Sequence, residues 1–220
     1  MAGKDKYEIA TRYWHEEPEG FSDAYRFSFN PVRLAAKMFL DQRSAQLKDS
    51  LDLNPSLVVG DIGCGSGELM DWLAARSKFV HGFDISEGMI AQARKNVTAK
   101  NVDLRVSDCT PIPLPDASVD RIVCLGVLDY LLDPQAFCRE LARITRPGGL
   151  IAVTAPKSPS LFEFLRWSTR FRHGVSRMPP IVSILDRRAM EQMLRDCNLS
   201  IVRMNAIWTT MWFAVARKAD

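Results

Sequence analysis

The sequence contains no uninterrupted apolar run that approaches the ~20 residues needed for a membrane-spanning helix. Its first 14 residues, MAGKDKYEIATRYW, also lack the apolar core of a secretory signal. We therefore expect a cytoplasmic protein.

Two further features are missing, a metal-ligand pattern and a strong charge of one sign. The five cysteines are scattered, and no two have C-x-x-C spacing, so we expect reduced thiols and no metal site. The formal net charge is only +3 over 220 residues, whereas nucleic-acid binding usually leaves a strong basic footprint. We therefore expect no DNA partner.

An alternation of short apolar runs and helical patterns begins at residue 57. The runs LVVGDI, FVHGFD, VDLRVSD, VDRIVCLGV and LIAVTA are expected strands. Helices are expected between them, one capped by Ser86 and one beginning at Asp133-Pro134. Strands that alternate with helices predict an α/β fold, a Rossmann-like doubly wound sheet that is mostly parallel.

The alternation stops after Pro156. A helix capped by Asp186 is then expected, followed by LSIVRMNAI and TTMWFAVARK, whose short link requires an antiparallel hairpin. The length favours a single domain over residues 1–220. Within it we expect an N-terminal lid (1–30), a core (57–155), a substrate cap (156–185), and a C-terminal helix with its hairpin (186–220).

The region before the core is aromatic and then helical. Residues 1–30 are rich in aromatic rings, and we expect this segment to close over the site through Tyr7, Tyr13 and Trp14. The alternative is that these rings pack on outer helices. Asn30-Pro31 starts an expected helix to about residue 50. Its expected buried stripe is Leu34, Met38, Ala45 and Leu47.

The turn DIGCGSGELM, residues 61–70, indicates a nucleotide-type ligand. Its spacing is G-x-G-x-G, and no Lys follows the glycines, which excludes a GK[ST] phosphate loop. A helix N-terminus attracts phosphate, but Asp61, Glu68 and Asp71 would oppose it. The turn therefore suits a ligand with a positive centre and no phosphate.

A further acidic residue, Asp84 in GFDIS, ends the second expected strand. A carboxylate at this position can accept hydrogen bonds from a ribose diol. The ligand is thus a nucleoside with a cationic extension. S-adenosylmethionine fits, because it carries a sulfonium and an ammonium group.

Four linked motifs now resemble the class I S-adenosylmethionine-dependent methyltransferases. They are DIGCGSGEL, GFDISEGMIAQAR, RVSDCTPIPLPDASVDRIVCLGVLDYL and ELARITRPGGLIAV, in the family's order over roughly residues 55–155. The terminal helix and hairpin also resemble that family, whose seventh strand is antiparallel. The resemblance implies the class I methyltransferase fold.

The resemblance also implies roles for single residues. The three glycines Gly63, Gly65 and Gly67 admit the methionine part, and Asp61 contacts its amino group. Asp84 binds the ribose, while Asp108 accepts from the adenine amino group. The other expected cofactor contacts are Cys64, Ile85, Met89, Cys109, Leu125 and, from the lid, Tyr13. Alternatives stay open. Asp108 could serve merely as a loop cap, and Cys64, Met89 and Cys109 could be packing residues without a cofactor contact.

Candidate catalytic residues are Asp129 and Tyr130, which follow the fourth strand, and His173. Methyl transfer from a sulfonium is an in-line displacement in which positioning can suffice. A general base is needed only for a hydroxyl or a protonated amine. The absence of an evident triad therefore does not argue against an enzyme.

Acceptor motifs are mostly absent. The N/D-P-P-Y/F stretch of amino-group base methyltransferases is replaced by CLGVLDY, and no Pro-Cys pair occurs. The paired glutamates of arginine methyltransferases are also missing. We expect a small-molecule acceptor, a hydroxyl on a hydrophobic or anionic metabolite. An RNA methyltransferase, a non-catalytic cofactor-binding subunit and an NAD-dependent oxidoreductase remain alternatives.

The stretch 156–178 has five basic residues, one acidic residue and several aromatic rings. If it is helical, it would resemble a helix at a membrane surface or a cap over an anionic, amphiphilic acceptor. Ordinary packing on the core is the alternative. Peripheral membrane contact therefore remains open, and the sequence does not indicate an oligomeric state.

Overall fold

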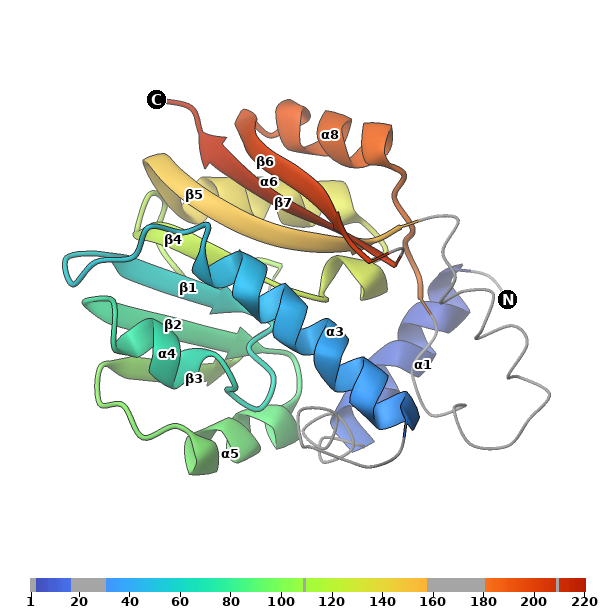
Figure 1. The fold of residues 1–220 in the computed structure, drawn as a ribbon, viewed down its shortest axis with the longest axis horizontal. Coiled ribbons are helices and arrows are strands. Elements are labelled where there is room, and N and C mark those ends of the chain that lie inside the picture. The colour runs from blue at the N-terminus through green and yellow to red at the C-terminus, as the bar shows by residue number, and fades with distance from the viewer. Residues whose placement is uncertain (1–2, 17–30, 109, 158–180, 209) are drawn as a thin grey trace.

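The computed structural model describes residues 3–16, 31–108, 110–157, 181–208 and 210–220. A seven-stranded sheet in the order β3-β2-β1-β4-β5-β7-β6 crosses the molecule (Figure 1). The strands β1 to β5 are parallel, and β7 is antiparallel to both β5 and β6. The strand bounds are β1 Val58–Ile62, β2 Phe79–Asp84, β3 Val102–Val106, β4 Val119–Cys124, β5 Thr145–Pro156, β6 Leu199–Ile207 and β7 Met211–Lys218.

Helices cover both faces of the sheet (Figure 1). On one face lie α3 (Pro31–Lys48), α4 (Met70–Ala74) and α5 (Glu87–Asn96), whose Leu47, Leu73 and Ile90 enter one apolar core. On the other lie α6 (Pro134–Ile144) and α8 (Arg187–Asp196) over a second core. This arrangement confirms the mostly parallel α/β fold that the sequence predicts.

Three helix starts agree with their expected caps. The Ser86 hydroxyl accepts from the Met89 amide, and the Asp133 and Asp186 carboxylates accept from amides three residues ahead. These bonds satisfy amides that have no partner inside a helix.

The buried stripe expected on α3 is mostly wrong. Leu34, Met38 and Ala45 are exposed, and of the four expected residues only Leu47 is buried. The buried stripe is instead Leu40, Arg43 and Leu47. Spacings of three and four residues are those of a helix face, but an arginine occupies one of its positions.

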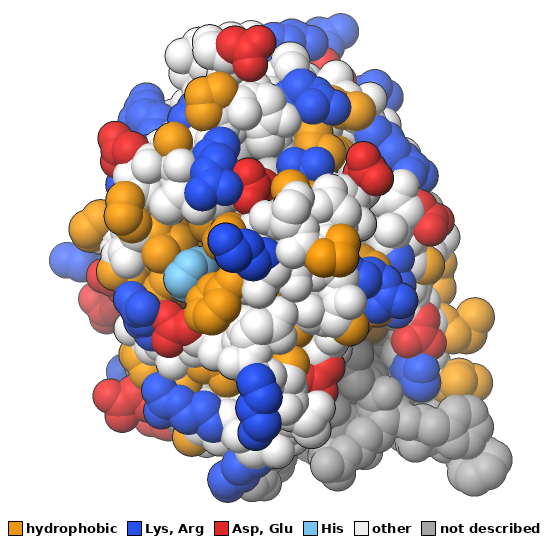
Figure 2. Space-filling view, turned by 90° about the vertical axis from the view of Figure 1, so that its left-hand side faces the viewer, with side chains coloured by type: hydrophobic (Ala, Val, Ile, Leu, Met, Phe, Trp, Pro, Cys, Tyr) orange, Lys and Arg blue, Asp and Glu red, His pale blue; other side chains and the backbone are white. Residues whose placement is uncertain are grey.

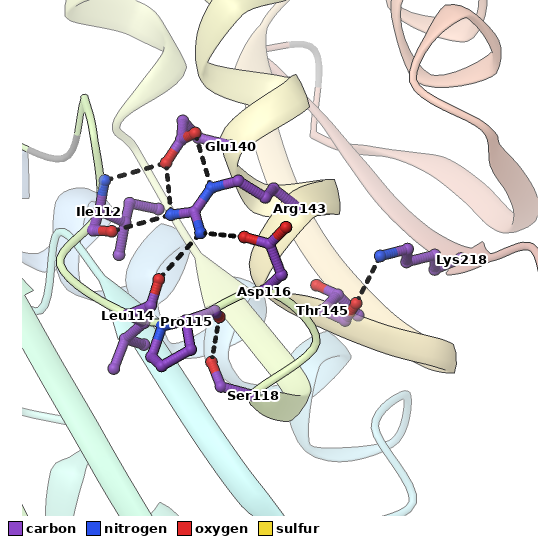
Figure 3. A network of polar contacts seen from close by, with 9 residues as sticks. All are labelled: Ile112, Leu114, Pro115, Asp116, Ser118, Glu140, Arg143, Thr145 and Lys218. Atoms are coloured by element: carbon purple, nitrogen blue, oxygen red, sulfur yellow. Dashed lines mark hydrogen bonds and ion pairs between the residues drawn. The ribbon is translucent and has the colours of Figure 1, made fainter.

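The proline-rich loop between β3 and β4 is held by two side chains of α6, Arg143 and Glu140 (Figure 3). The Arg143 guanidinium donates to the carbonyl oxygens of Ile112 and Leu114, at 2.9 Å each, and pairs with Asp116 and Glu140. Glu140 in turn accepts from the Ile112 amide. This network fixes the loop without regular backbone structure.

The carboxyl ends of the parallel strands face α1 (Gly3–Glu16), which crosses that end of the sheet (Figure 1). It contacts α5 and the short 3-10 helix η2 (Leu128–Tyr130), and its Ala10 is fully buried. The opposite face carries the amino ends, and its basic and acidic side chains are interspersed (Figure 2). No helix of the described residues is long and apolar enough to cross a membrane.

Candidate cofactor and acceptor site

The glycine turn follows β1 and lies against the end of β2. The amides of Gly63 and Cys64 donate to the Phe83 carbonyl oxygen, at 2.7 and 2.9 Å. Gly63 has φ +79°, and a Cβ there would lie 2.2 Å from Cγ2 of Val127. Only glycine fits this left-handed and crowded position. The turn therefore packs closely against Val127, which follows β4.

Asp84 connects this turn to the start of α5. Its carboxylate accepts from the amides of Gly65 and Ser86, at 2.9 Å each. A carboxylate has about four lone-pair sites and can accept from a diol as well as from backbone amides. Asp84 thus lies beside the glycine turn, at the end of β2, where the sequence predicts the ribose.

Asp61, the last acidic residue before the turn, is buried, with 3% of its surface exposed. Burial raises the pKa of its carboxyl to about 7, and Glu68 and Asp84 add to this rise while Arg43 opposes it. A cation beside Asp61 would favour its charged form. The position therefore suits an ammonium group.

Arg43 is a site residue that the sequence analysis did not single out. It belongs to α3 and is only 6% exposed, and a Cβ on Gly126 would lie 3.2 Å from its Nη1. Its charge lowers the pKa of both Asp61 and Asp129. The available signal was its spacing, since Arg43 lies three residues after Leu40 and four before Leu47.

Asp129 lies in η2, just after the carboxyl end of β4, and is 7% exposed. Burial raises the pKa of its carboxyl to about 7, against the effect of Arg43. Its Oδ1 is buried and has no hydrogen-bond partner among the described residues. Tyr130 follows on the same turn and is half-buried.

The other expected contacts fall into three groups. Cys64, Met89 and Leu125 are buried near the turns, and Ile85 and Tyr13 are half-buried. Asp108 is exposed and accepts from the Thr110 amide at 3.2 Å, which is the bond of a loop cap. Cys109, His173 and the Trp14 side chain lie outside the described parts.

Two acidic residues are placed differently from the expectation. The helix α4 begins at Met70, so Glu68 precedes it, and the Glu68 carboxylate accepts from the Ser66 hydroxyl. Asp71 is in the first turn but accepts from the amides of Thr98 and Ala99. It therefore holds the loop before β3, and Asp61 remains the buried acid at the turn.

The chain is similar to known methyltransferases in sequence. The family described as "Methyltransferase domain" matches residues 60–153. A protein of Mycolicibacterium smegmatis, named as an S-adenosylmethionine-dependent methyltransferase, is 38% identical over 44% of this chain and 37% of its own length. A ubiquinone biosynthesis O-methyltransferase of Hahella chejuensis is 30% identical over 71% of this chain and 62% of its own. The matches span less than two thirds of these relatives' length.

Solved structures share the fold at lower identity. The magnesium protoporphyrin IX methyltransferase ChlM of Synechocystis, with bound S-adenosylhomocysteine, has a TM-score of 0.75 at 20% identity, over 96% of this chain and 99% of its own. The [4+2]-cyclase SpnF has a TM-score of 0.73 at 18% identity, over 97% of each chain.

The fold and the site define an α/β nucleoside-binding protein whose ligand carries a positive centre. Residues 60–153 match the methyltransferase-domain family, and the relatives include proteins named as S-adenosylmethionine-dependent methyltransferases. The residues of this chain fit S-adenosylmethionine, because the buried Asp61 would complement the ammonium group and Arg43 would complement the carboxylate of the amino-acid part. Asp84 offers acceptors to the ribose.

Proposed function

We propose that this chain transfers the methyl group of S-adenosylmethionine to a hydroxyl group of a small hydrophobic or anionic acceptor. The observation that carries the proposal is the placement of Asp61, Arg43 and Asp84 around one glycine turn. Bound cofactor supplies an activated methyl group. The name of the O-methyltransferase relative supports an oxygen acceptor.

The acceptor would enter beside η2. The Gly126 amide donates to the Thr154 hydroxyl at 2.8 Å, which joins the ends of β4 and β5. The Lys157 amide donates to the Thr210 carbonyl oxygen, and the amides of Val182 and Ser183 donate to that of Asp129. Lys157, near the start of the expected cap, and the later residues Val182 and Ser183 are therefore all held by backbone hydrogen bonds. These bonds support the proposal of a substrate cap over residues 156–185.

The N-terminal lid belongs to the same proposal. The helix α1 crosses the carboxyl ends of the strands, and Tyr13 is half-buried there. The proposed lid would exclude water from the methyl group, and this strengthens the interactions of Asp61 and Arg43.

Calorimetry of S-adenosylmethionine binding tests the cofactor part. Asp84→Ala should weaken binding by roughly 1.5–3 kcal/mol, the range for hydrogen bonds to a charged group. Asp71→Asn is the matched control, because this acid bonds to the loop before β3, and its affinity should equal that of the wild type. Equal affinity in Asp84→Ala, or tight NAD binding, would contradict the proposal.

A labelled-cofactor assay tests the acceptor part. The protein is incubated with methyl-labelled S-adenosylmethionine and fractionated extract of its source cell, and label should move into a small-molecule fraction. Transfer of label to RNA would favour the RNA alternative, whose basic stretch lies mostly outside the described residues. Cofactor binding with no transfer would indicate a non-catalytic subunit. SpnF, whose title names a [4+2]-cyclase, shows that this fold also occurs in a protein named for another reaction.

A further inference from the structure

The Asp129 carboxyl is held where an acceptor would meet the methyl group. Its main-chain carbonyl oxygen accepts from the Val182 amide at 2.8 Å and the Ser183 amide at 3.2 Å. These bonds fix η2 against the chain that leads into α8. The side chain therefore has a defined place at the carboxyl end of β4.

The Asp129 Oδ1 atom is buried with no partner among the described residues. Native proteins rarely leave a buried carboxyl oxygen without a hydrogen bond. A group that donates a proton to this oxygen would complete the site. An acceptor hydroxyl is such a donor, whereas a carboxylate acceptor is not.

Arg43 is the charged side chain that acts on this carboxyl among the described residues. Its guanidinium comes from α3 and lies next to Gly126, three residues before Asp129. The helix α1 and the strand β5, which also contact η2, add no charge that shifts the pKa of Asp129. The neighbouring titratable group on η2 is Tyr130.

We propose that Asp129 is the catalytic base, that it takes the proton of a phenol-type or enol-type hydroxyl on the acceptor, and that Arg43 is the positioning residue whose charge favours the ionised form of the Asp129 carboxyl. This rests on the proposed function. In the reaction the acceptor oxygen forms a bond to the methyl carbon while the sulfur–methyl bond breaks. The bonding pair stays on sulfur, which becomes a neutral thioether, and the hydroxyl proton goes to Asp129 Oδ1.

The Asp129 Oδ1 atom, which has no partner in the described part of the chain, selects a hydroxyl acceptor, and the strength of this base agrees with that class. The pKa of Asp129 is about 7, while a tyrosine-type phenol has a pKa of about 10. Proton transfer from such a hydroxyl is feasible within a transition state, and a base near the working pH is the most effective. An alcohol holds its proton far more tightly. A carboxylic acid is already ionised at neutral pH and would be repelled by Asp129.

An infrared titration of the cofactor-free protein tests the Asp129–Arg43 pair without turnover. In the wild type, the carbonyl band of the protonated buried carboxyls should disappear as pH rises through about 7. In Asp129→Asn, the contribution of Asp129 to this band should be absent at every pH. Asp61→Asn identifies the band of the other buried acid. Arg43→Gln should move the Asp129 midpoint to higher pH, and Arg43→Lys should restore it.

Product analysis tests the acceptor class with the holoenzyme. Asp129→Asn should lower kcat by about 100-fold or more, the usual range for a general base, with cofactor affinity within twofold of the wild type. The labelled product should keep its methyl group in alkali, because aryl and enol ethers resist hydrolysis there.

Three results would overturn the inference: an unchanged infrared titration in Asp129→Asn, the same Asp129 midpoint in Arg43→Gln and wild type, or a product that releases labelled methanol in alkali as a methyl ester. Failure of the proposed function can be distinguished from failure of this inference. It would appear as an absence of S-adenosylmethionine binding, while the infrared titration of the cofactor-free protein would still show the Asp129–Arg43 interaction.

Discussion

At the scale of single residues, Gly63 is a position where backbone conformation and crowding both oppose a side chain. Gly63→Ala would place a methyl group 2.2 Å from Val127 Cγ2 at φ +79°. We expect a loss of about 1–3 kcal/mol in unfolding free energy and weaker cofactor binding. Gly60→Ala is the control, because its new Cβ would meet nothing closer than 3.6 Å. Chemical denaturation and calorimetry measure both effects, and equal behaviour of the two variants would refute this account.

The two buried acids predict how stability depends on pH. The folded-state pKa values of Asp61 and Asp129 are raised from 3.8 to about 7, so the folded state binds more protons than the unfolded state between these values. Unfolding free energy should therefore fall as pH rises from about 4 to about 7, by up to about 4 kcal/mol for each acid.

Asp129→Asn removes one of these groups and should reduce the decrease in unfolding free energy between about pH 4 and about pH 7. Urea denaturation at pH 5 and pH 8 measures it. Asp41→Asn removes an exposed carboxyl of α3 and should keep the wild-type difference between the two pH values. If Asp129→Asn shows the wild-type difference, Asp129 is ionised throughout the range.

Sequence reasoning at this scale reached Asp61, Asp84 and Asp129 because each lies at or just beyond the carboxyl end of an apolar strand. It missed Arg43, since helical periodicity assigns apolar residues to buried positions and cannot show that a buried charge meets two acids from β1 and η2. It also misassigned Asp71, whose partners Thr98 and Ala99 are 27 and 28 residues away in the chain. Such pairings depend on tertiary contacts.

At the scale of elements, the proposed lid can be tested with a matched pair on α1. Ala10 is fully buried and its neighbour Ile9 is exposed. Ala10→Arg should lift α1 from α5 and η2, because a long charged side chain does not fit a buried alanine position. Turnover should fall strongly, and circular dichroism should still show the folded sheet. Ile9→Arg adds the same charge and should keep full activity. Equal activity of both variants would exclude a lid role for α1.

The elements themselves were predictable where periodicity was strong. The strands and α5, α6 and α8 agree with the apolar patterns and caps of the sequence. The helix after the glycine turn, α4, has only five residues, because the residues before Met70 form the turns of the glycine loop. The strand β5 begins earlier, at Thr145, and pairs along β4 and β7. The apolar pattern of one strand does not reveal which neighbouring strands it pairs with, so this early start could not be predicted.

At the scale of the whole molecule, the doubly wound sheet brings four distant segments to one edge. The glycine turn, the end of β2, η2 and α3 meet there, and each would contribute one group to the proposed cofactor and acceptor site. A ligand that engages several of these segments binds the folded state alone. It should therefore stabilise the whole sheet by mass action.

S-adenosylhomocysteine, the demethylated product, at 100 times its dissociation constant should add about 2.7 kcal/mol to the unfolding free energy. For a chain of this size each kcal/mol raises Tm by roughly 2–4 °C, so we expect an increase of about 5–11 °C in thermal denaturation. NAD at equal concentration should not change Tm, because its pyrophosphate would meet the buried Asp61 and the neighbouring Glu68. Asp84→Ala should need more S-adenosylhomocysteine for the same increase. A rise with NAD that matches the rise with S-adenosylhomocysteine would mean that these carboxylates do not select the ligand.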